Sequence, residues 1–225
     1  KKNKLFIGAL ALLMAFTTAC SSKTENTTTT SQDKDTFTYA INSDPSSTNP
    51  INVSDRWGLT MTNMIYSPLI RVEGDGSLVN ELAESTELAK DGLSLTVNLK
   101  KGIKWSDGQD FTADDVVFTY ETKAKKENGN FKSLWINDKP ITIEKKDDHT
   151  VVFKFPEPSA AAANNIATET YIIPKHIYGK VSDFSVKDLQ EKPVGTGPYK
   201  LVENKRGEYI KFEANENYYK GKPKV

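Results

Sequence analysis

Residue types that commonly perform catalysis or bind metals are few in this sequence and form no recognisable group. The two histidines, His149 and His176, have neither a cysteine nor another histidine at the spacing of metal ligands. The sequence contains no Gly-x-Ser-x-Gly nucleophile elbow, no His-Glu-x-x-His zinc motif and no Walker phosphate loop. We therefore predict no catalytic residue, no metal ligand and no cofactor, and we interpret His176 as a structural histidine.

Two further motifs resemble sites but are better explained by the backbone. Gly195-Thr196-Gly197 resembles the start of a phosphate loop, but the residues from Pro198 onward have the pattern of a strand rather than of a helix N-terminus. We interpret these glycines as part of a tight turn. Asp114 and Asp115 could form a metal pair, but their position behind Thr112 predicts helix capping instead.

The N-terminal residues have the layout of an export signal. Three lysines lie ahead of residues 5–19, a stretch without charge that is shorter than the roughly 20 residues of a membrane-spanning helix. Cys20, the one cysteine, follows directly. The segment resembles the signal of bacterial lipoproteins, in which such a cysteine becomes the lipidated first residue of the mature chain. We predict a signal peptide at residues 1–19 and lipidation, as by palmitate, at Cys20; an ordinary signal with a chance cysteine is the alternative, because Thr17 stands where leucine is usual.

Residues 21–36 contain no apolar side chain, so they cannot bury enough surface to offset the entropy lost on ordering. We predict that residues 20–36 are the lipidated cysteine and a disordered tether, which holds a globular body off the membrane. With a single cysteine, no disulfide can form within the chain.

The charges of the chain exclude one class of partner. The 30 basic and 30 acidic side chains cancel, and removal of the three N-terminal lysines with the signal leaves a net charge of about −3. This balance lacks the basic excess that nucleic-acid binding requires, so we predict no nucleic-acid partner.

The remainder of the chain has a mixed pattern that is richer in strands than in helices. We predict strands at residues 36–41, 69–72 and 93–99, hairpins of residues 141–145 with 150–155 and 199–203 with 209–214, a short helix at residues 58–66, and an irregular loop at residues 44–50. A second helix begins after Thr112, because Asp115 completes a capping box, while Phe111 and Val116 are spaced for a hydrophobic staple.

Eight short motifs follow one another along the chain between residues 68 and 223. They are Pro68-Leu69-Ile70, Glu81-Leu82-Ala83-Glu84-Ser85, Asp91-Gly92-Leu93, residues 99–108, residues 111–118, Ile173-Pro174-Lys175-His176, residues 195–199 and residues 217–223. In order and spacing they resemble the extracellular solute-binding proteins of the oligopeptide and dipeptide permease family, family 5. Thr86 departs from the pattern, since an aromatic residue is usual there. The nickel-binding branch shares these motifs, so they do not define the ligand.

This resemblance implies a two-lobed periplasmic-binding-protein-like α/β fold with mixed sheets, of the large peptide-binding type. Residues 37–66 and 193–225 would belong to lobe I, and residues 67–192 would form its extra subdomain. Lobe II, which in the family carries the acidic residue that clamps the peptide's amino terminus, would lie outside this chain. We therefore expect an N-terminal fragment that forms half of a binding site.

The resemblance also implies a function. The expected protein is the substrate-binding lipoprotein of an ABC importer, a monomer on the extracellular face of the bacterial cell membrane. It would capture short peptides and deliver them to the membrane subunits of the permease. The alternatives are a surface adhesin or structural lipoprotein, a binder of a nickel chelate or another small solute, and an exported hydrolase.

Candidate ligand-binding residues lie in the polar loop before the first predicted helix and at that helix's start, because loops at sheet edges commonly carry binding groups. They are Ser46, Ser47, Thr48, Asn49, Arg56 and Trp57, with Tyr171 as a further candidate. The alternative interpretation is a solvated connection, with Trp57 packed inside the lobe.

Overall fold

The computed structural model describes residues 36–128, 131–159, 164, 166, 170–184 and 192–225. By their contacts, residues 37–225 form one unit, separate from residues 1–36. The predicted signal peptide, Cys20 and almost all of the tether lie outside the described residues.

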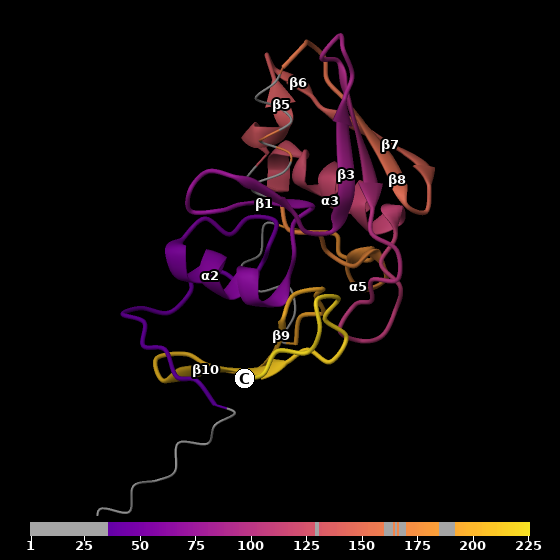
Figure 1. The fold of residues 1–225 in the computed structure, drawn as a ribbon. Helices are drawn as coiled ribbons and strands as arrows, with labels where there is room; N and C mark the ends of the chain where they lie inside the picture. Colours follow the sequence, from indigo (N-terminus) through magenta and orange to yellow (C-terminus); the bar gives the residue numbers. More distant parts are fainter. Residues whose placement is uncertain (1–35, 129–130, 160–163, 165, 167–169, 185–191) are drawn as a thin grey trace, which may run out of the picture. The chain divides into compact units, whose positions relative to one another are not determined.

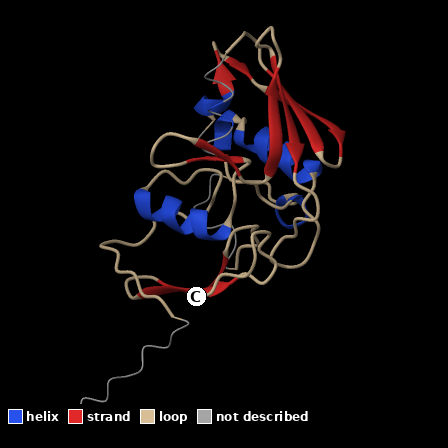
Figure 2. Ribbon diagram, in the orientation of Figure 1, coloured by secondary structure: helices blue, strands red, loops and turns tan. Residues whose placement is uncertain are grey.

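An antiparallel sheet of four strands, in the order β3-β4-β8-β7, is the largest sheet of the described chain (Figures 1 and 2). Its strands are β3 (Ala83–Leu88), β4 (Ser94–Leu99), β8 (Thr150–Lys154) and β7 (Thr142–Asp147). Leu95 lies opposite Phe153, and Val97 opposite Val151, so these alternate residues share one face.

Helix α3 (Ala113–Lys123) packs against β7 and β8 of this sheet. The predicted capping box is confirmed, because Asp115 Oδ2 accepts a hydrogen bond of 3.0 Å from the Thr112 N–H, and the Thr112 side chain accepts one in return. Phe111 and Val116 are both buried in the core that lies between helix and sheet. Burying side chains of this size stabilises the fold by about 1.5–3 kcal/mol each.

A second hydrophobic cluster surrounds helix α2 (Arg56–Ile65). Met61 and Ile65 of α2 are buried in it, together with Leu201 of strand β9. Tyr66 follows the helix, and its hydroxyl lies 2.8 Å from that of Tyr178 at the end of α5 (Lys175–Tyr178). Burial raises the pKa of both tyrosines, so both remain neutral and one hydroxyl donates a hydrogen bond to the other.

Three smaller hairpins and two short 3-10 helices complete the described chain. The hairpins are β1 (Ile70–Val72) with β2 (Leu78–Asn80), β5 (Trp135–Ile136) with β6 (Lys139–Pro140), and β9 (Tyr199–Lys205) with β10 (Tyr209–Ala214). The 3-10 helices are η1 (Lys126–Asn128) and η2 (Lys132–Leu134). Both predicted hairpins, the two predicted helices and the strands near residues 70 and 95 are confirmed, whereas β2, β3, β5, β6 and α5 were not predicted.

The strand predicted at residues 36–41 is wrong for this structure. These residues are in no strand, and the side chains of Phe37 and Tyr39 are 75% and 57% exposed. Alternation of polar and apolar residues favours an extended chain, but a strand also needs a hydrogen-bonded neighbour. None of the strands in the described part of the chain pairs with this segment.

Candidate functional site

Three of the residues predicted to bind a ligand are buried, and hydrogen bonds of their side chains stabilise the loop before α2. Asn49 is fully buried; its Nδ2 donates to the Phe184 carbonyl at 2.7 Å, and its Oδ1 accepts from the Ile51 N–H at 2.9 Å. Ser47 is also buried, and its Oγ accepts from the Asn49 N–H at 3.0 Å. Thr48 is buried between them. These three side chains therefore shape the loop, and their contact with a ligand stays a prediction.

Ser46 is exposed and forms hydrogen bonds with Asp55, the N-cap residue of α2. Its N–H and hydroxyl both donate to Asp55 Oδ2, while the other oxygen of Asp55 accepts from the Gly58 N–H at 2.9 Å. Partial burial would raise the pKa of Asp55, but the hydrogen bonds from Ser46 and Gly58 hold it below its ordinary value. The carboxylate is therefore charged at neutral pH, and it fixes the loop to the helix N-terminus.

Arg56 and Trp57, in the first turn of α2, form a cluster with two residues of the preceding segment. The Trp57 indole N–H donates to Asn42 Oδ1 at 2.8 Å, and the Tyr39 ring lies 6.2 Å from the Trp57 ring. The Arg56 guanidinium carbon lies 5.4 Å from the centre of the Trp57 ring, which is within the range of a cation–π contact. We call Tyr39, Asn42, Arg56 and Trp57 the α2 surface cluster. The sequence alone did not indicate that Tyr39 and Asn42 lie beside Trp57.

Tyr171 does not belong to the α2 surface cluster. It is 8% exposed, pairs with Pro68 in an isolated β-bridge and belongs to the second hydrophobic cluster, with Ile51 and Met61. The structure thus brings six of the seven predicted residues into one loop and helix start, and it places Tyr171 in the packing beneath.

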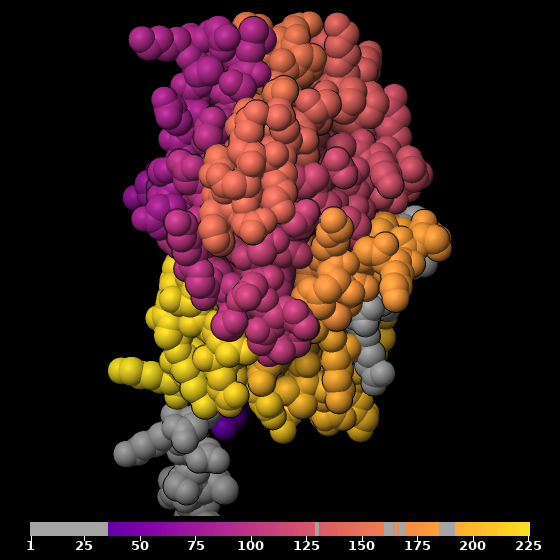
Figure 3. All heavy atoms as spheres, turned by 90° about the vertical axis from the view of Figure 1, so that its right-hand side faces the viewer, coloured from indigo at the N-terminus to yellow at the C-terminus, as the bar shows by residue number. Residues whose placement is uncertain are grey.

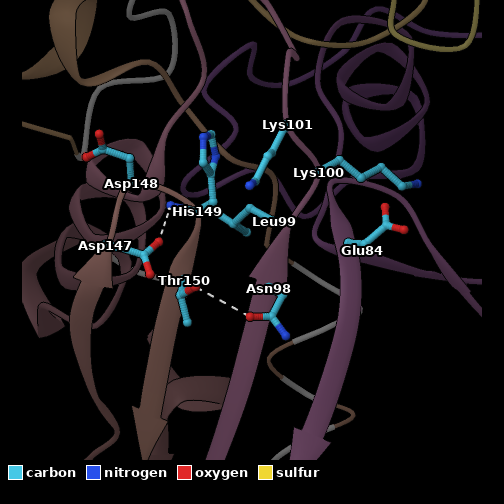
Figure 4. A pocket seen from close by; sticks show the side chains of 9 residues that line it. All are labelled: Glu84, Asn98, Leu99, Lys100, Lys101, Asp147, Asp148, His149 and Thr150. Atoms are coloured by element: carbon cyan, nitrogen blue, oxygen red, sulfur yellow. Dashed lines mark hydrogen bonds between the residues drawn. The ribbon is translucent and has the colours of Figure 1, made fainter.

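A polar recess of about 780 Å³ lies at one end of the four-stranded sheet, where β3, β4 and the β7–β8 turn meet (Figure 4). Glu84, Lys101, Asp147 and His149 contribute to its lining. The His149 N–H donates to Asp147 Oδ1 at 2.8 Å, and this bond is the main reason that the pKa of Asp147 lies below its ordinary value. The Nδ1 atom of His149 is buried without a hydrogen-bond partner among the described residues.

The lining of the recess combines carboxylates and lysines with His149 and Thr150, which are groups that can form hydrogen bonds and ion pairs with a polar ligand. Among the residues that the structure describes, no three His, Cys, Asp or Glu side chains group to hold a metal ion. The sequence indicated the Asp147-Asp148 turn but not the recess beside it.

His176 has a structural partner, as its interpretation requires. Its Nε2 lies 2.7 Å from Asp107 Oδ2, and its ring lies edge-on to the buried Trp105. In the space-filling view, magenta and orange parts of the chain, which are far apart in the sequence, adjoin (Figure 3). The pair thus connects the start of α5 to the turn at residues 106–107, ahead of α3.

Relatives of known sequence identify the class of protein. The profile of "Bacterial extracellular solute-binding proteins, family 5 Middle" matches residues 77–225, and the chain belongs to this family. It is 36% identical to the oligopeptide-binding protein AppA of Bacillus subtilis over 99% of this chain and 42% of AppA. The chain therefore spans about two-fifths of the length of that curated relative.

Solved structures agree with this assignment. The substrate-binding protein CtaP of Listeria monocytogenes matches 82% of this chain and 37% of its own, with 40% identity and a TM-score of 0.75. AppA of B. subtilis, solved with a nonapeptide, matches with a TM-score of 0.73 and 36% identity, over 81% of this chain and 36% of its own. NikZ of Campylobacter jejuni, solved with Ni(L-His), reaches a TM-score of 0.72 at 31% identity, over 84% and 37% of the two chains. The mixed α/β fold of the chain thus matches rather more than a third of each of these larger structures.

Among the described residues, no helix combines the length and the apolar composition that crossing a bilayer requires.

Proposed function

We propose that this chain is part of the substrate-binding protein of an ABC importer, which captures oligopeptides outside the cell and delivers them to the membrane subunits of the permease. The observation that carries the proposal is the 36% identity to an oligopeptide-binding protein over almost the whole chain. The similarity to the peptide-bound structure of AppA supports it.

The proposed binding surface is the loop before α2 with the exposed start of that helix. Arg56 and Ser46 are exposed and Trp57 is half-buried, while the buried Ser47, Thr48 and Asn49 hold the loop in place. Tyr171 would support the site from the packing beneath it. A peptide can be bound through its backbone as an added strand, and bridging waters then tolerate different side chains.

We propose further that the site closes by a hinge motion between this lobe and a second lobe. Within the chain, residues 37–66 and 193–225 would form part of lobe I, and residues 67–192 its extra subdomain. The two hydrophobic clusters support this division, since one draws on residues 69–172 and the other surrounds α2. Residues from 171 to 184 contribute to the second cluster, so the division of the core is less sharp than the predicted boundaries.

We place the protein, as a monomer, at the extracellular face of the cell membrane. Its anchor would be a lipid on Cys20 after removal of residues 1–19, with the polar segment up to residue 36 as a tether. The membership of a family of extracellular solute-binding proteins supports the location outside the cell.

The test is calorimetric titration of the full-length, lipid-free protein with a pool of short peptides. We expect saturable binding with a negative heat-capacity change, because closure of a cleft on a peptide buries apolar surface. A folded protein that has been stripped of carried-over ligand and yet releases no heat with any peptide would contradict the proposal.

A nickel chelate is the second candidate ligand, because NikZ matches the chain almost as well as AppA does. The same protein should therefore be titrated with a nickel–histidine complex. Binding of the complex, together with failure to bind peptides, would favour the second candidate.

A further inference from the structure

Arg56 is the cation of the α2 surface cluster, and the ring of Trp57 contacts its guanidinium on one side. The indole of Trp57 lies under the guanidinium, with 5.4 Å between the guanidinium carbon and the ring centre. Trp57 is itself fixed by its hydrogen bond of 2.8 Å to Asn42 and by the Tyr39 ring. A cation–π contact of this kind leaves the N–H fork of the guanidinium available, and because the fork is planar, less entropy is lost for each hydrogen bond that it forms.

Arg56 forms no ion pair within the described part of the chain. Its immediate neighbour Asp55 is charged, but both oxygens of Asp55 accept hydrogen bonds from Ser46 and Gly58. No ion pair joins Arg56 to any described carboxylate, although Arg71, by comparison, pairs with Glu81 at 3.2 Å. Arg56 is thus a preorganised cation without an anionic partner among these residues.

A planar guanidinium recognises a carboxylate with two parallel hydrogen bonds, and such charge-assisted bonds are roughly twice as strong as neutral ones. An extended chain that follows the loop before α2 would bring its own carboxylates past this point.

We propose that Arg56 binds a carboxylate of the captured peptide and so selects for peptides that carry one within reach of α2. The carboxylate belongs either to the C-terminus or to an acidic side chain. This inference rests on the proposed function, and it assigns Arg56 a role that the other residues of the loop do not share.

The test compares matched peptides on the full-length, lipid-free protein by calorimetry. One pair differs only in a free or an amidated C-terminus, and the other pair has aspartate or asparagine at an internal position. We expect the wild-type protein to prefer the carboxylate form in one of the pairs, and that pair identifies the source of the carboxylate. R56Q should weaken binding of the preferred peptide by about ten- to a hundredfold, the range for loss of a charged hydrogen bond, and leave the amide form within about twofold.

Two controls separate this contact from a general effect of charge. R56K keeps the charge but loses the fork, so it should restore only part of the affinity. K90Q removes another exposed cation without a described ion pair and should leave both peptides unaffected.

Peptide binding without preference for the carboxylate form, or equal weakening of both forms by R56Q, would overturn the inference and leave the proposed function intact. Absence of binding for every peptide would overturn both. The thermal unfolding of R56Q, which we expect to match the wild type, shows that the variant is folded.

Discussion

At the residue scale, Glu81 shows how a nearly buried carboxylate joins distant parts of the chain. Its side chain is 2% exposed, yet it lies 3.2 Å from Arg71 Nη2 and 2.6 Å from Lys220 Nζ, and it accepts a hydrogen bond from the Tyr219 hydroxyl. Burial alone would raise the pKa of Glu81, but the hydrogen bonds from Lys220 and Tyr219 and the charge of Arg71 hold it below its ordinary value of 4.5. Glu81 therefore ties the β1–β2 region to the segment after β10.

This network predicts a pH-dependent contribution to stability. Because the folded pKa of Glu81 is depressed, its contribution is present above about pH 4.5 and is lost as the pH falls through the folded pKa. We expect E81Q to lower the free energy of unfolding by about 2 kcal/mol at pH 7, since two cations lose their buried partner. The difference from wild type should shrink at pH 3. Urea unfolding of the protein at the two pH values measures it.

Glu84 provides the matched control, because it is exposed and three residues further along. E84Q should change the stability by no more than about 0.5 kcal/mol. An E81Q effect of equal size at both pH values would show that the network acts through packing rather than through charge.

At the scale of elements, the turn at residues 195–197 closes against the end of α2. The Gly197 N–H donates to the Ile65 carbonyl at 2.8 Å, and Gly195 exchanges hydrogen bonds with Ser106. A Cβ atom added to Gly195 would lie 1.9 Å from the Ile65 oxygen. The glycines are therefore required for a close approach of two backbones, which is a different reason from the tight turn that the sequence suggested.

We predict that G195A lowers the free energy of unfolding by at least about 2 kcal/mol, because neither backbone can move aside without loss of packing. G74A serves as the control, since a Cβ at Gly74 would meet no atom within 4 Å. Urea unfolding of both variants measures the difference. A G195A protein as stable as the wild type would show that the end of α2 can shift at little cost.

Elements whose signals are local could be predicted from the sequence. The capping box of Thr112 and Asp115 lies within four residues, and β4 alternates strictly between polar and apolar side chains. Both predicted hairpins have turn formers between two strand-like runs. In each case the residues that determine the element belong to the element itself.

Features that depend on distant residues could not be predicted. Strand β3 is almost fully exposed along one edge of its sheet, so its sequence shows no alternation. The buried state of Asn49 depends on Phe184, which is 135 residues away, and the position of Trp57 depends on the course of residues 39–42. The loop before α2 was therefore predicted, but its division into buried and exposed side chains was not.

At the scale of the whole molecule, residues 37–41 carry apolar side chains at alternate positions, but no strand among the described residues pairs with them. The relatives are more than twice as long as this chain. The hydrogen bonds of a strand lie in the plane of its sheet, so a neighbour can pair with this segment without displacing Tyr39 from Trp57. The segment thus has the residue pattern of a strand without a paired strand among the described residues.

We predict that residues 37–41 are paired in a sheet when the chain is part of a protein as long as its relatives. Their amide hydrogens should then exchange at least about tenfold more slowly than in the 225-residue chain produced alone, because exchange requires opening of the paired strand. Hydrogen exchange measured by mass spectrometry on peptides that cover these residues gives the comparison. The amides of β4, which are paired within this chain, should be protected in both proteins and show that the shorter chain is folded. Equally fast exchange of residues 37–41 in both proteins would mean that the segment stays unpaired, and that its alternation serves contacts such as that of Tyr39 with Trp57.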